Sequence, residues 1–337
     1  MIYLDNAATT KTAPEVIEAM LPYFGEQYGN PSAIYSLGSA AKKAVNRAKR
    51  TIAAAIGAKQ EEIYFTSGGT EADNWALKCA AEAYQEKGKH LITTRIEHHA
   101  VLHTCAWLEK KGFEVTYLPV NEEGLVDLEE LKAAIRPDTI LISVMFANNE
   151  IGTIEPVAEI GAVAREHGIL FHTDAVQAFG QLPLDVEELR IDLLSASGHK
   201  VNGPKGIGFL YVRSGLKLGS FFHGGAQERN RRAGTENVPG IVGLEAAAER
   251  AMRLMEEKTK KVSGLRDYLI RKIEAEIPYC RLNGHRTKRL PGNVNFSFSF
   301  VEGESVLIMV DLKAISASSR SASTSGALHP SQVLLAR

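Results

Sequence analysis

The segment LLSASGHKVNGPKGIGFLYV, residues 193–212, carries a lysine directly after a short apolar run. Lys200 follows His199, and the turn-forming residues NGPKG come next. A lysine at the end of a strand is either solvated or a functional amine, because desolvation lowers its pKa and lets it form a Schiff base. The segment therefore predicts a strand that ends at a candidate reactive amine, and the flanking sequence has to decide between the two roles.

Short apolar runs of this kind alternate with helical patterns through most of the chain. The runs are rich in Ile, Leu and Val and lack polar alternation, which predicts strands buried on both faces of a sheet. Strands are expected at residues 62–66, 90–94, 113–120, 139–146, 169–174 and 191–197, and helices at about 13–24, 37–56, 70–86, 99–111, 127–135 and 156–167. This order predicts an α/β fold with a mostly parallel sheet and right-handed crossovers.

The pattern changes towards the C-terminus. A long amphipathic helix is expected over residues 238–275, followed by a half-exposed strand in GNVNFSFSF, residues 292–300, where polar and apolar residues alternate. A length of 337 residues favours two domains. We therefore predict a large α/β domain over residues 1–245 and a smaller α+β domain over residues 246–337, with the hinge within 238–260.

Composition excludes several classes of function. With 45% hydrophobic residues and a net charge of −1, the chain is expected to be soluble and to bind neither nucleic acid nor a membrane surface. No apolar run approaches the ~20 residues that span a bilayer, and the N-terminus does not resemble a signal peptide. Cys79, Cys105 and Cys280 are widely spaced, so no disulfide framework and no metal site are expected. A cytoplasmic location fits best.

A second strand end carries a candidate phosphate site. In FTSGGTEADN, residues 65–74, an expected strand ends at Thr66 and a helix opens at Thr70. The backbone N–H groups of Gly69 and Thr70 and the Thr70 hydroxyl could hold a phosphate at the positive end of that helix. The alternative is a simple strand-to-helix turn in which Thr70 caps the helix.

A third strand end carries a carboxylate. Asp174, in FHTDAVQAFG at residues 171–180, ends an apolar strand, where a buried carboxylate needs a cation or hydrogen-bond donors. Alone it is more often a cap or turn residue. Together, however, a phosphate cradle, a buried carboxylate and the strand-end Lys200 are what pyridoxal 5′-phosphate requires: an anchor, a partner for the pyridine nitrogen and an amine for the aldehyde.

Longer segments point to a family. The chain resembles the cysteine desulfurases, which belong to class V of the fold-type I pyridoxal-phosphate enzymes. The resemblance runs from end to end, and it rests on YLDNAATT (3–10), YGNPSAIYSLG (28–38), FTSGGTEADN (65–74), TRIEHHAV (94–101), ANNEIGT (147–153), HTDAVQ (172–177), SGHKVNGPKG (197–206), GGAQERNRRAGTEN (224–237) and SASTSGALHPS (321–331). It implies a large cofactor-binding domain with a mostly parallel sheet of the seven-stranded type, and a smaller α+β domain.

The resemblance also implies roles for single residues. Lys200 corresponds to the lysine that binds the cofactor aldehyde and moves the substrate proton, and Asp174 to the partner of the pyridine nitrogen. His98 would stack on the pyridine ring, although before the resemblance a surface histidine beside His99 is an equal alternative. The remaining implied cofactor residues are Gln177 and Asn149 at the phenolic oxygen and Gly69, Thr70, Ser197 and His199 at the phosphate.

Two further positions bear on assembly and substrate. Thr235 corresponds to a residue that reaches the phosphate of the other subunit, which implies a homodimer with shared active sites. Asn30 corresponds to a residue that helps to bind the substrate. The neighbouring Arg229, Arg231 and Arg232 are expected to form mostly a solvated basic turn.

The chain departs from the family at the loop that carries the nucleophile. The family pattern resembles SSGSACTSG, whereas residues 318–326 read SSRSASTSG, so Ser323 stands where the persulfide-forming cysteine belongs and Arg320 where glycine is usual. Family members also continue beyond this loop with a segment that includes a carboxylate-binding arginine, which has no counterpart up to Arg337. We expect Ser323→Cys to restore persulfide formation only together with that segment.

The implied function is the removal of sulfur from L-cysteine. The products would be L-alanine and a protein persulfide that serves a sulfur acceptor or an iron–sulfur scaffold protein. With Ser323 as the catalytic loop residue, this activity is expected to be impaired. The alternatives are a dimeric pyridoxal-phosphate-binding scaffold without turnover, and a selenocysteine lyase or β-lyase that needs no loop cysteine.

Overall fold

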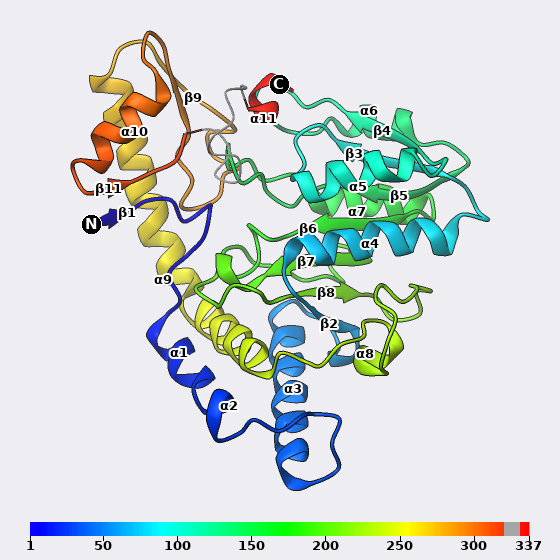
Figure 1. The fold of residues 1–337 in the computed structure, drawn as a ribbon. Helices are drawn as coiled ribbons and strands as arrows, with labels where there is room; N and C mark the ends of the chain where they lie inside the picture. The colour runs from blue at the N-terminus through cyan, green and yellow to red at the C-terminus, as the bar shows by residue number, and fades with distance from the viewer. Residues whose placement is uncertain (320–330, 337) are drawn as a thin grey trace.

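The computed structural model describes residues 1–319 and 331–336. A central seven-stranded sheet has the strand order β2-β8-β7-β6-β5-β3-β4 (Figure 1). Its strands are β2 (Ile63–Thr66), β3 (His90–Thr94), β4 (Glu114–Leu118), β5 (Thr139–Ser143), β6 (Leu170–Asp174), β7 (Leu193–Ser197) and β8 (Gly208–Val212). Only β8 runs antiparallel to its neighbours within this sheet, so the predicted mostly parallel α/β architecture is confirmed.

The sequence analysis did not predict β8 as a strand. It follows β7 after residues 198–207, a connection shorter than the crossover that parallel neighbours need, so the two strands pair antiparallel. Gly208 opens β8 at a point of close approach, because a Cβ there would lie 2.4 Å from the Ala196 carbonyl oxygen and 2.8 Å from Gly68 Cα. The glycine therefore lets β8 pack between β7 and the turn that follows β2.

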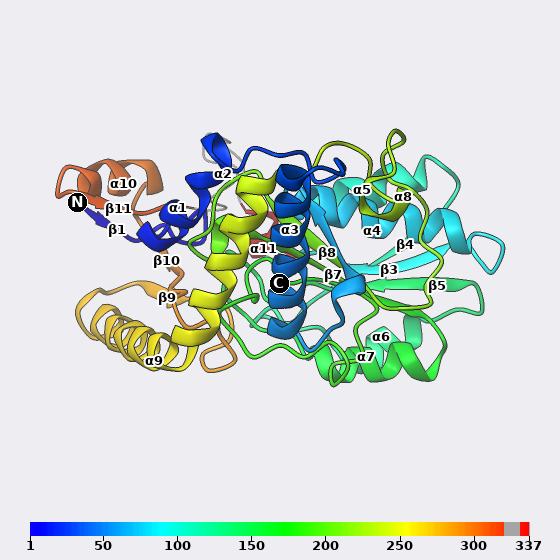
Figure 2. The ribbon, with the colours of Figure 1, turned by 90° about the horizontal axis from the view of Figure 1, so that it is seen from below.

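Helices cover both faces of the sheet (Figure 2). One face carries α4 (Gly69–Tyr84) and α5 (His99–Glu109), and the other carries α3 (Ser36–Ala55), α6 (Leu128–Ala134), α7 (Val157–Glu166) and the first part of α9 (Val238–Glu276). Successive strand residues point to opposite faces. Leu91 and Leu141 therefore pack against α4 and α5, whereas Ile92 and Ile142 pack in the other core.

The predicted helix over residues 13–24 is two helices, α1 (Pro14–Met20) and α2 (Pro22–Gly25). Pro22 has no backbone N–H to continue α1, so it starts a new helix instead.

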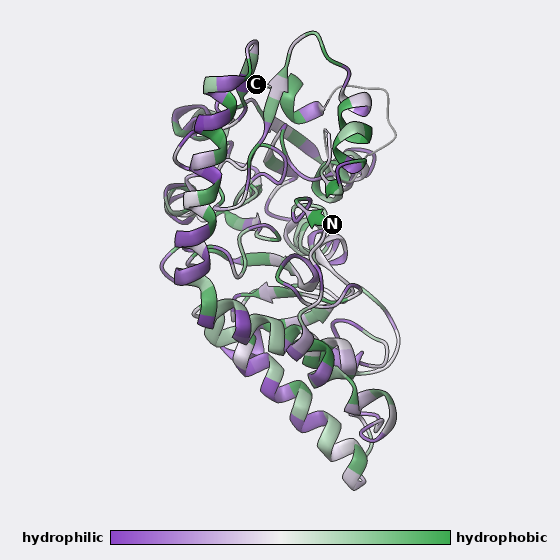
Figure 3. Cartoon of the chain, turned by 90° about the vertical axis from the view of Figure 1, so that its left-hand side faces the viewer, coloured by the Kyte–Doolittle hydropathy of each residue, from purple (hydrophilic) through white to green (hydrophobic). Residues whose placement is uncertain are grey.

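Surface helices carry hydrophilic and hydrophobic segments in alternation (Figure 3), as expected where one helical face is buried.

The smaller part of the molecule contains short elements. They are β1 (Ile2–Tyr3) paired in parallel with β11 (Ile315–Ser316), β9 (Cys280–Leu282) paired with β10 (Phe296–Phe298), and α10 (Gly303–Asp311). The C-terminal helix α11 (Gln332–Leu335) packs instead against the core of the large sheet through Val333, and α8 (Gln227–Asn230) lies in the loop before α9. The strand expected over 292–300 is wrong at both ends, because its partner β9 offers only three residues.

The long helix α9 passes through residue 245 without a break. The domain division at 245/246 therefore stays a prediction. Over residues 1–319 and 331–336, no helix combines the length and the apolar character needed to cross a membrane.

Candidate active site

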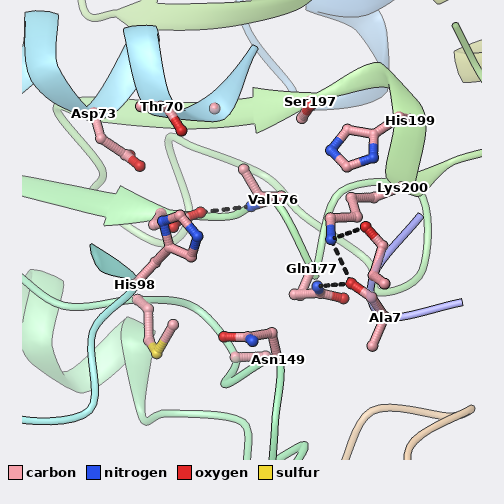
Figure 4. Close-up of a pocket in the computed structure, with 15 residues that line it drawn as sticks. Ala7, Thr70, Asp73, His98, Asn149, Val176, Gln177, Ser197, His199 and Lys200 are labelled. Carbon is pink, nitrogen blue, oxygen red and sulfur yellow. Dashed lines mark hydrogen bonds between the residues drawn. The ribbon is translucent and has the colours of Figure 1, made fainter. Parts of the chain in front are cut away.

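A cavity of about 190 Å³ opens where β6 and β7 end (Figure 4). Ligands bind at this edge of parallel sheets because loops diverge there and leave a crevice. The residues that line the cavity are Ala7, Ala8, Gly69, Thr70, Asp73, His98, Met145, Ala147, Asn149, Asp174, Val176, Gln177, Ser197, His199 and Lys200.

Lys200 lies on a 3₁₀ turn (Gly198–Lys200) directly after β7. Its Nζ donates hydrogen bonds to the carbonyl oxygens of Ala7 and, at 2.9 Å, Ala8. Burial lowers the pKa of Lys200 to about 8, although the charges of Asp174 and Asp5 oppose this effect. The amine can therefore exist in both protonation states near neutral pH, as a nucleophile or proton carrier requires.

Asp174 is the last residue of β6, and only 6% of its surface is exposed. Its Oδ1 accepts a hydrogen bond from the Val176 N–H at 2.9 Å. Burial raises the pKa of Asp174, whereas the charges of His98 and Lys200 and this hydrogen bond oppose the rise. The carboxylate is therefore poised to ionise against a cationic partner in the cavity.

A second carboxyl group lies beside Asp174. Asp73, on α4, is 1% exposed, and ligand atoms of Asp73, His98 and Asp174 all lie within 4.8 Å of one another. Burial, together with the charge of Asp174, raises the pKa of Asp73 well above its usual range. Of the two carboxyl groups, Asp174 is therefore the one that ionises more readily.

His98 caps the N-terminus of α5. Its Nδ1 accepts a hydrogen bond from the Ala100 N–H at 3.1 Å. Because Nδ1 is an acceptor, the ring proton of a neutral His98 sits on Nε2. The cap fixes the ring at the cavity wall, on the same side of the cavity as Asp73 in Figure 4.

The opposite end of the cavity is suited to an anion. β2 ends at Thr66, and Gly68, at a φ of 152°, leads into α4, which begins at Gly69. A Cβ at Gly69 would lie 2.6 Å from Val176 Cγ2, so only glycine lets the helix N-terminus approach this closely. The positive end of α4 thus faces the cavity beside Ser197.

The side chains of His199 and Gln177 are held by the N-terminal segment. Gln177 Nε2 donates to the Ala7 carbonyl oxygen at 3.0 Å, and His199 Nδ1 lies 3.1 Å from Thr9 Oγ1. Burial, helped by the charge of Lys200, lowers the pKa of His199 to about 4, so its ring is neutral at pH 7. Residues 7–9 therefore form one wall of the cavity.

These features suit pyridoxal phosphate. The helix start at Gly69 offers an anion site, Asp174 a charge for a pyridinium nitrogen, and Lys200 an amine of lowered pKa, all around one cavity. All the predicted cofactor residues except Thr235 line this cavity.

Three predicted positions lie elsewhere. Thr235 and Asn30 are exposed and do not line the cavity, and Ser323 lies outside the described residues. Asn30 sits between α2 and α3, where its Oδ1 accepts from the Ser32 N–H at 2.9 Å. Its role in substrate binding stays a prediction.

The sequence analysis missed Asp73 and the Ala7–Ala8 carbonyl groups. Asp73 lies three positions after Thr70, one helical turn along α4, and this spacing could have indicated that both face the cavity. The Ala7 and Ala8 carbonyl groups carry no signal of their own in the sequence.

Comparison with known proteins shows the family of this chain. The family model "Aminotransferase class-V" matches residues 2–335. The "Cysteine desulfurase IscS" of Methanosarcina thermophila is 59% identical over 335 residues, which cover 99% of this chain and 83% of that protein. The chain belongs to the cysteine desulfurase family. Pyridoxal phosphate, the cofactor of this family, is therefore its cofactor.

Solved structures of related proteins share the fold. A "NifS-like protein" superposes with a TM-score of 0.93 at 38% identity, covering 99% of this chain and 89% of that one. A structure titled "SspA in complex with cysteine" superposes with a TM-score of 0.86 at 39% identity, covering 100% of this chain and 94% of that one. The predicted family and fold are thus confirmed.

Proposed function

We propose that this protein acts on L-cysteine as a pyridoxal-phosphate-dependent desulfurase, with the cofactor in the cavity at the ends of β6 and β7. The observation that carries the proposal is the convergence of Asp174, Lys200 and the Gly69–Thr70 helix start on one cavity. Relatives named cysteine desulfurase and one titled as a cysteine complex support the substrate.

Each residue has a distinct task in this proposal. When bound, pyridoxal phosphate supplies an electron sink for the bonds of the substrate α-carbon. Lys200, with its pKa near 8, removes and returns the α-proton. Asp174 holds a proton on the pyridine nitrogen, and His98 covers the ring. Gln177 and Asn149 bind the phenolic oxygen, and Gly69, Thr70, Ser197 and His199 hold the phosphate.

Ser323 favours a second candidate function. Sulfur transfer requires a thiolate, and a serine hydroxyl is a poor nucleophile without a positioned base. We therefore propose that the chain binds cysteine and stalls before it forms a persulfide, which is the behaviour of a cofactor-binding scaffold. A β-lyase that needs no loop cysteine would instead eliminate hydrogen sulfide from the substrate, and hydrolysis of the remainder would give pyruvate and ammonia.

The proposal includes a homodimer and a sulfur acceptor. Thr235 follows Gly234, which has a φ of 106°, and it is exposed instead of lining the cavity of its own chain. This placement supports a role at the phosphate of a second subunit. The acceptor would be a sulfur-carrier or iron–sulfur scaffold protein. The free state of Cys79, Cys105 and Cys280 fits a reducing cytoplasm.

The first prediction concerns the reactivity of Lys200. Apo-protein mixed with pyridoxal phosphate should develop a visible absorption band, at a rate that rises with pH and levels off above about 8. The rate rises with pH because only the neutral amine attacks an aldehyde. With an ordinary lysine, whose pKa is ~10.4, the rate would level off only above that pH. Borohydride reduction followed by peptide mapping should place the label on the peptide that contains Lys200.

Lys258 provides the matched control. Burial also lowers its pKa, but it lines a second cavity beside α9, which shares Lys200 with the cofactor cavity, and it does not line the cofactor cavity itself. Lys258→Arg should keep the band, and Lys200→Arg should lose it. A label on any other peptide would overturn the assignment of Lys200.

The second prediction concerns Thr235. Thr235→Ala should weaken pyridoxal phosphate binding about tenfold, since a hydrogen bond to a charged group contributes ~1.5–3 kcal/mol. If sites are shared, a hybrid dimer of Thr235→Ala and Lys200→Ala subunits should contain one intact site. Spectral titration of the hybrid against both parents measures this. Failure of the hybrid to regain that site, or wild-type affinity in a monomeric protein, would contradict sharing.

A further inference from the structure

The expected solvated basic turn is wrong for Arg232. Its Nε donates to Glu71 Oε1 at 2.8 Å and its Nη2 donates to Glu71 Oε2 at 3.1 Å, so the pair is bidentate. The two side chains are only 21% and 7% exposed. A planar guanidinium with both bonds made to one partly buried carboxylate holds that carboxylate in one orientation.

Glu71 belongs to the turn that forms the anion site. It lies in the first turn of α4, next to Thr70, and its Oε2 also accepts the Ser67 N–H at 2.8 Å. Burial acts to raise the pKa of Glu71, but the hydrogen bonds from Arg232 and Ser67 outweigh it and the pKa is lowered. A carboxylate thus stays ionised beside a turn that has to accept a dianionic phosphate.

The loop that carries Arg232 is also held in place at Glu228, four residues earlier in the chain. Glu228 is buried, and it accepts hydrogen bonds from Lys49 Nζ and, at 3.4 Å, from the Phe65 N–H. Glu228, Arg229 and Asn230 have φ values of 45°, 57° and 61°, a strained run that persists only where surrounding contacts hold it. Phe65 lies on β2, directly before the anion turn, and Glu71 lies directly after it. The loop therefore makes hydrogen bonds to the chain on both sides of that turn.

We propose that Arg232 is a positioning residue that sets the phosphate affinity of the cofactor site by neutralising and orienting Glu71. Without Arg232, the Glu71 charge would be uncompensated next to the Gly69–Thr70 anion site, and we expect its repulsion of the phosphate to cost about tenfold in affinity. This inference rests on the proposed function in one respect, which is that the phosphate binds at the Gly69–Thr70 helix start.

The test measures binding to apo-protein by absorption, with pyridoxal phosphate and with pyridoxal, which lacks the phosphate. Arg232→Gln should raise the Kd for pyridoxal phosphate about tenfold and leave the Kd for pyridoxal unchanged. Adding Glu71→Gln removes the repelling charge but keeps an acceptor for Ser67. The double variant should therefore bind pyridoxal phosphate nearly as tightly as the unchanged protein.

Arg229→Gln is the matched control, since it removes the same charge from the same loop. Arg229 contacts the Glu61 carbonyl oxygen and Tyr64, not Glu71, so its loss should leave both Kd values unchanged. Equal weakening of both ligands by Arg232→Gln, or no recovery in the double variant, would overturn the inference. Thr70→Ala tests the proposed phosphate site independently of the role of Arg232. If it does not weaken pyridoxal phosphate binding, the proposed phosphate site itself is wrong.

Discussion

Asp174→Asn should slow exchange of the substrate α-proton about 10³-fold while the fold stays intact, within the range that proton-transfer catalysis contributes. An asparagine amide carries no charge and cannot hold a proton on the pyridine nitrogen that faces it, so the substrate Cα–H bond is no longer acidified. Incorporation of solvent deuterium at the α-carbon of L-cysteine and L-alanine, followed by mass spectrometry, measures this. The readout does not depend on Ser323.

Asp73→Asn is the matched control for this experiment. Burial and the charge of Asp174 keep the pKa of Asp73 well above its usual range, so the change replaces a neutral acid with a neutral amide. We expect little effect on exchange. If Asp73→Asn slows exchange as much as Asp174→Asn does, Asp73 carries the charge and the assignment of the two carboxyl groups is reversed.

In a chain extended to the full length of its curated relatives, Ser323→Cys should turn a protein that forms no persulfide into one that carries it on residue 323. A free thiol with a pKa of ~8.5 is partly thiolate near neutral pH, whereas a serine hydroxyl stays protonated. The thiolate attacks the substrate sulfur, so an S–S bond forms as the C–S bond breaks and alanine is released. Peptide mapping after incubation with L-cysteine should find one extra sulfur atom at this position.

The experiment compares four proteins. They are the unchanged chain and its Ser323→Cys variant, each at the given length and extended to the full length of the relative of which it covers 83%. We expect persulfide only where the thiol and the extension are both present. Robust sulfide release from the unchanged chain would show a lyase and not a stalled desulfurase.

The other cysteines provide an internal control. Burial raises the pKa of Cys79 to about 12 and also raises that of Cys105, so neither forms a thiolate at neutral pH. Cys280 is partly exposed. Persulfide on Cys280, or equal amounts with and without Ser323→Cys, would contradict a role for residue 323.

Much of this architecture follows from local sequence patterns. Uninterrupted apolar runs bury both faces of a strand, so the six predicted strands are present in the order expected. Asp174 and Lys200 each lie at the end of such a run, and adjacent parallel strands bring their ends together, so the cofactor and these two residues could be predicted from local patterns. The roles of the other cofactor residues, apart from the Gly69–Thr70 turn, were predicted from the family resemblance. The signal lies within each short segment and needs no knowledge of distant contacts.

Other features depend on which segments pack together. The pairing of β8 between β2 and β7, the burial of Asp73 beside Asp174, and the Ala7 and Ala8 carbonyl groups at Lys200 join positions far apart in the chain. Arg232 and Glu71 are 161 residues apart. An arginine in a polar loop has the same local pattern whether it is solvated or paired. The folded chain places that loop against the first turn of α4, and only this packing makes Arg232 the partner of the buried Glu71 carboxylate.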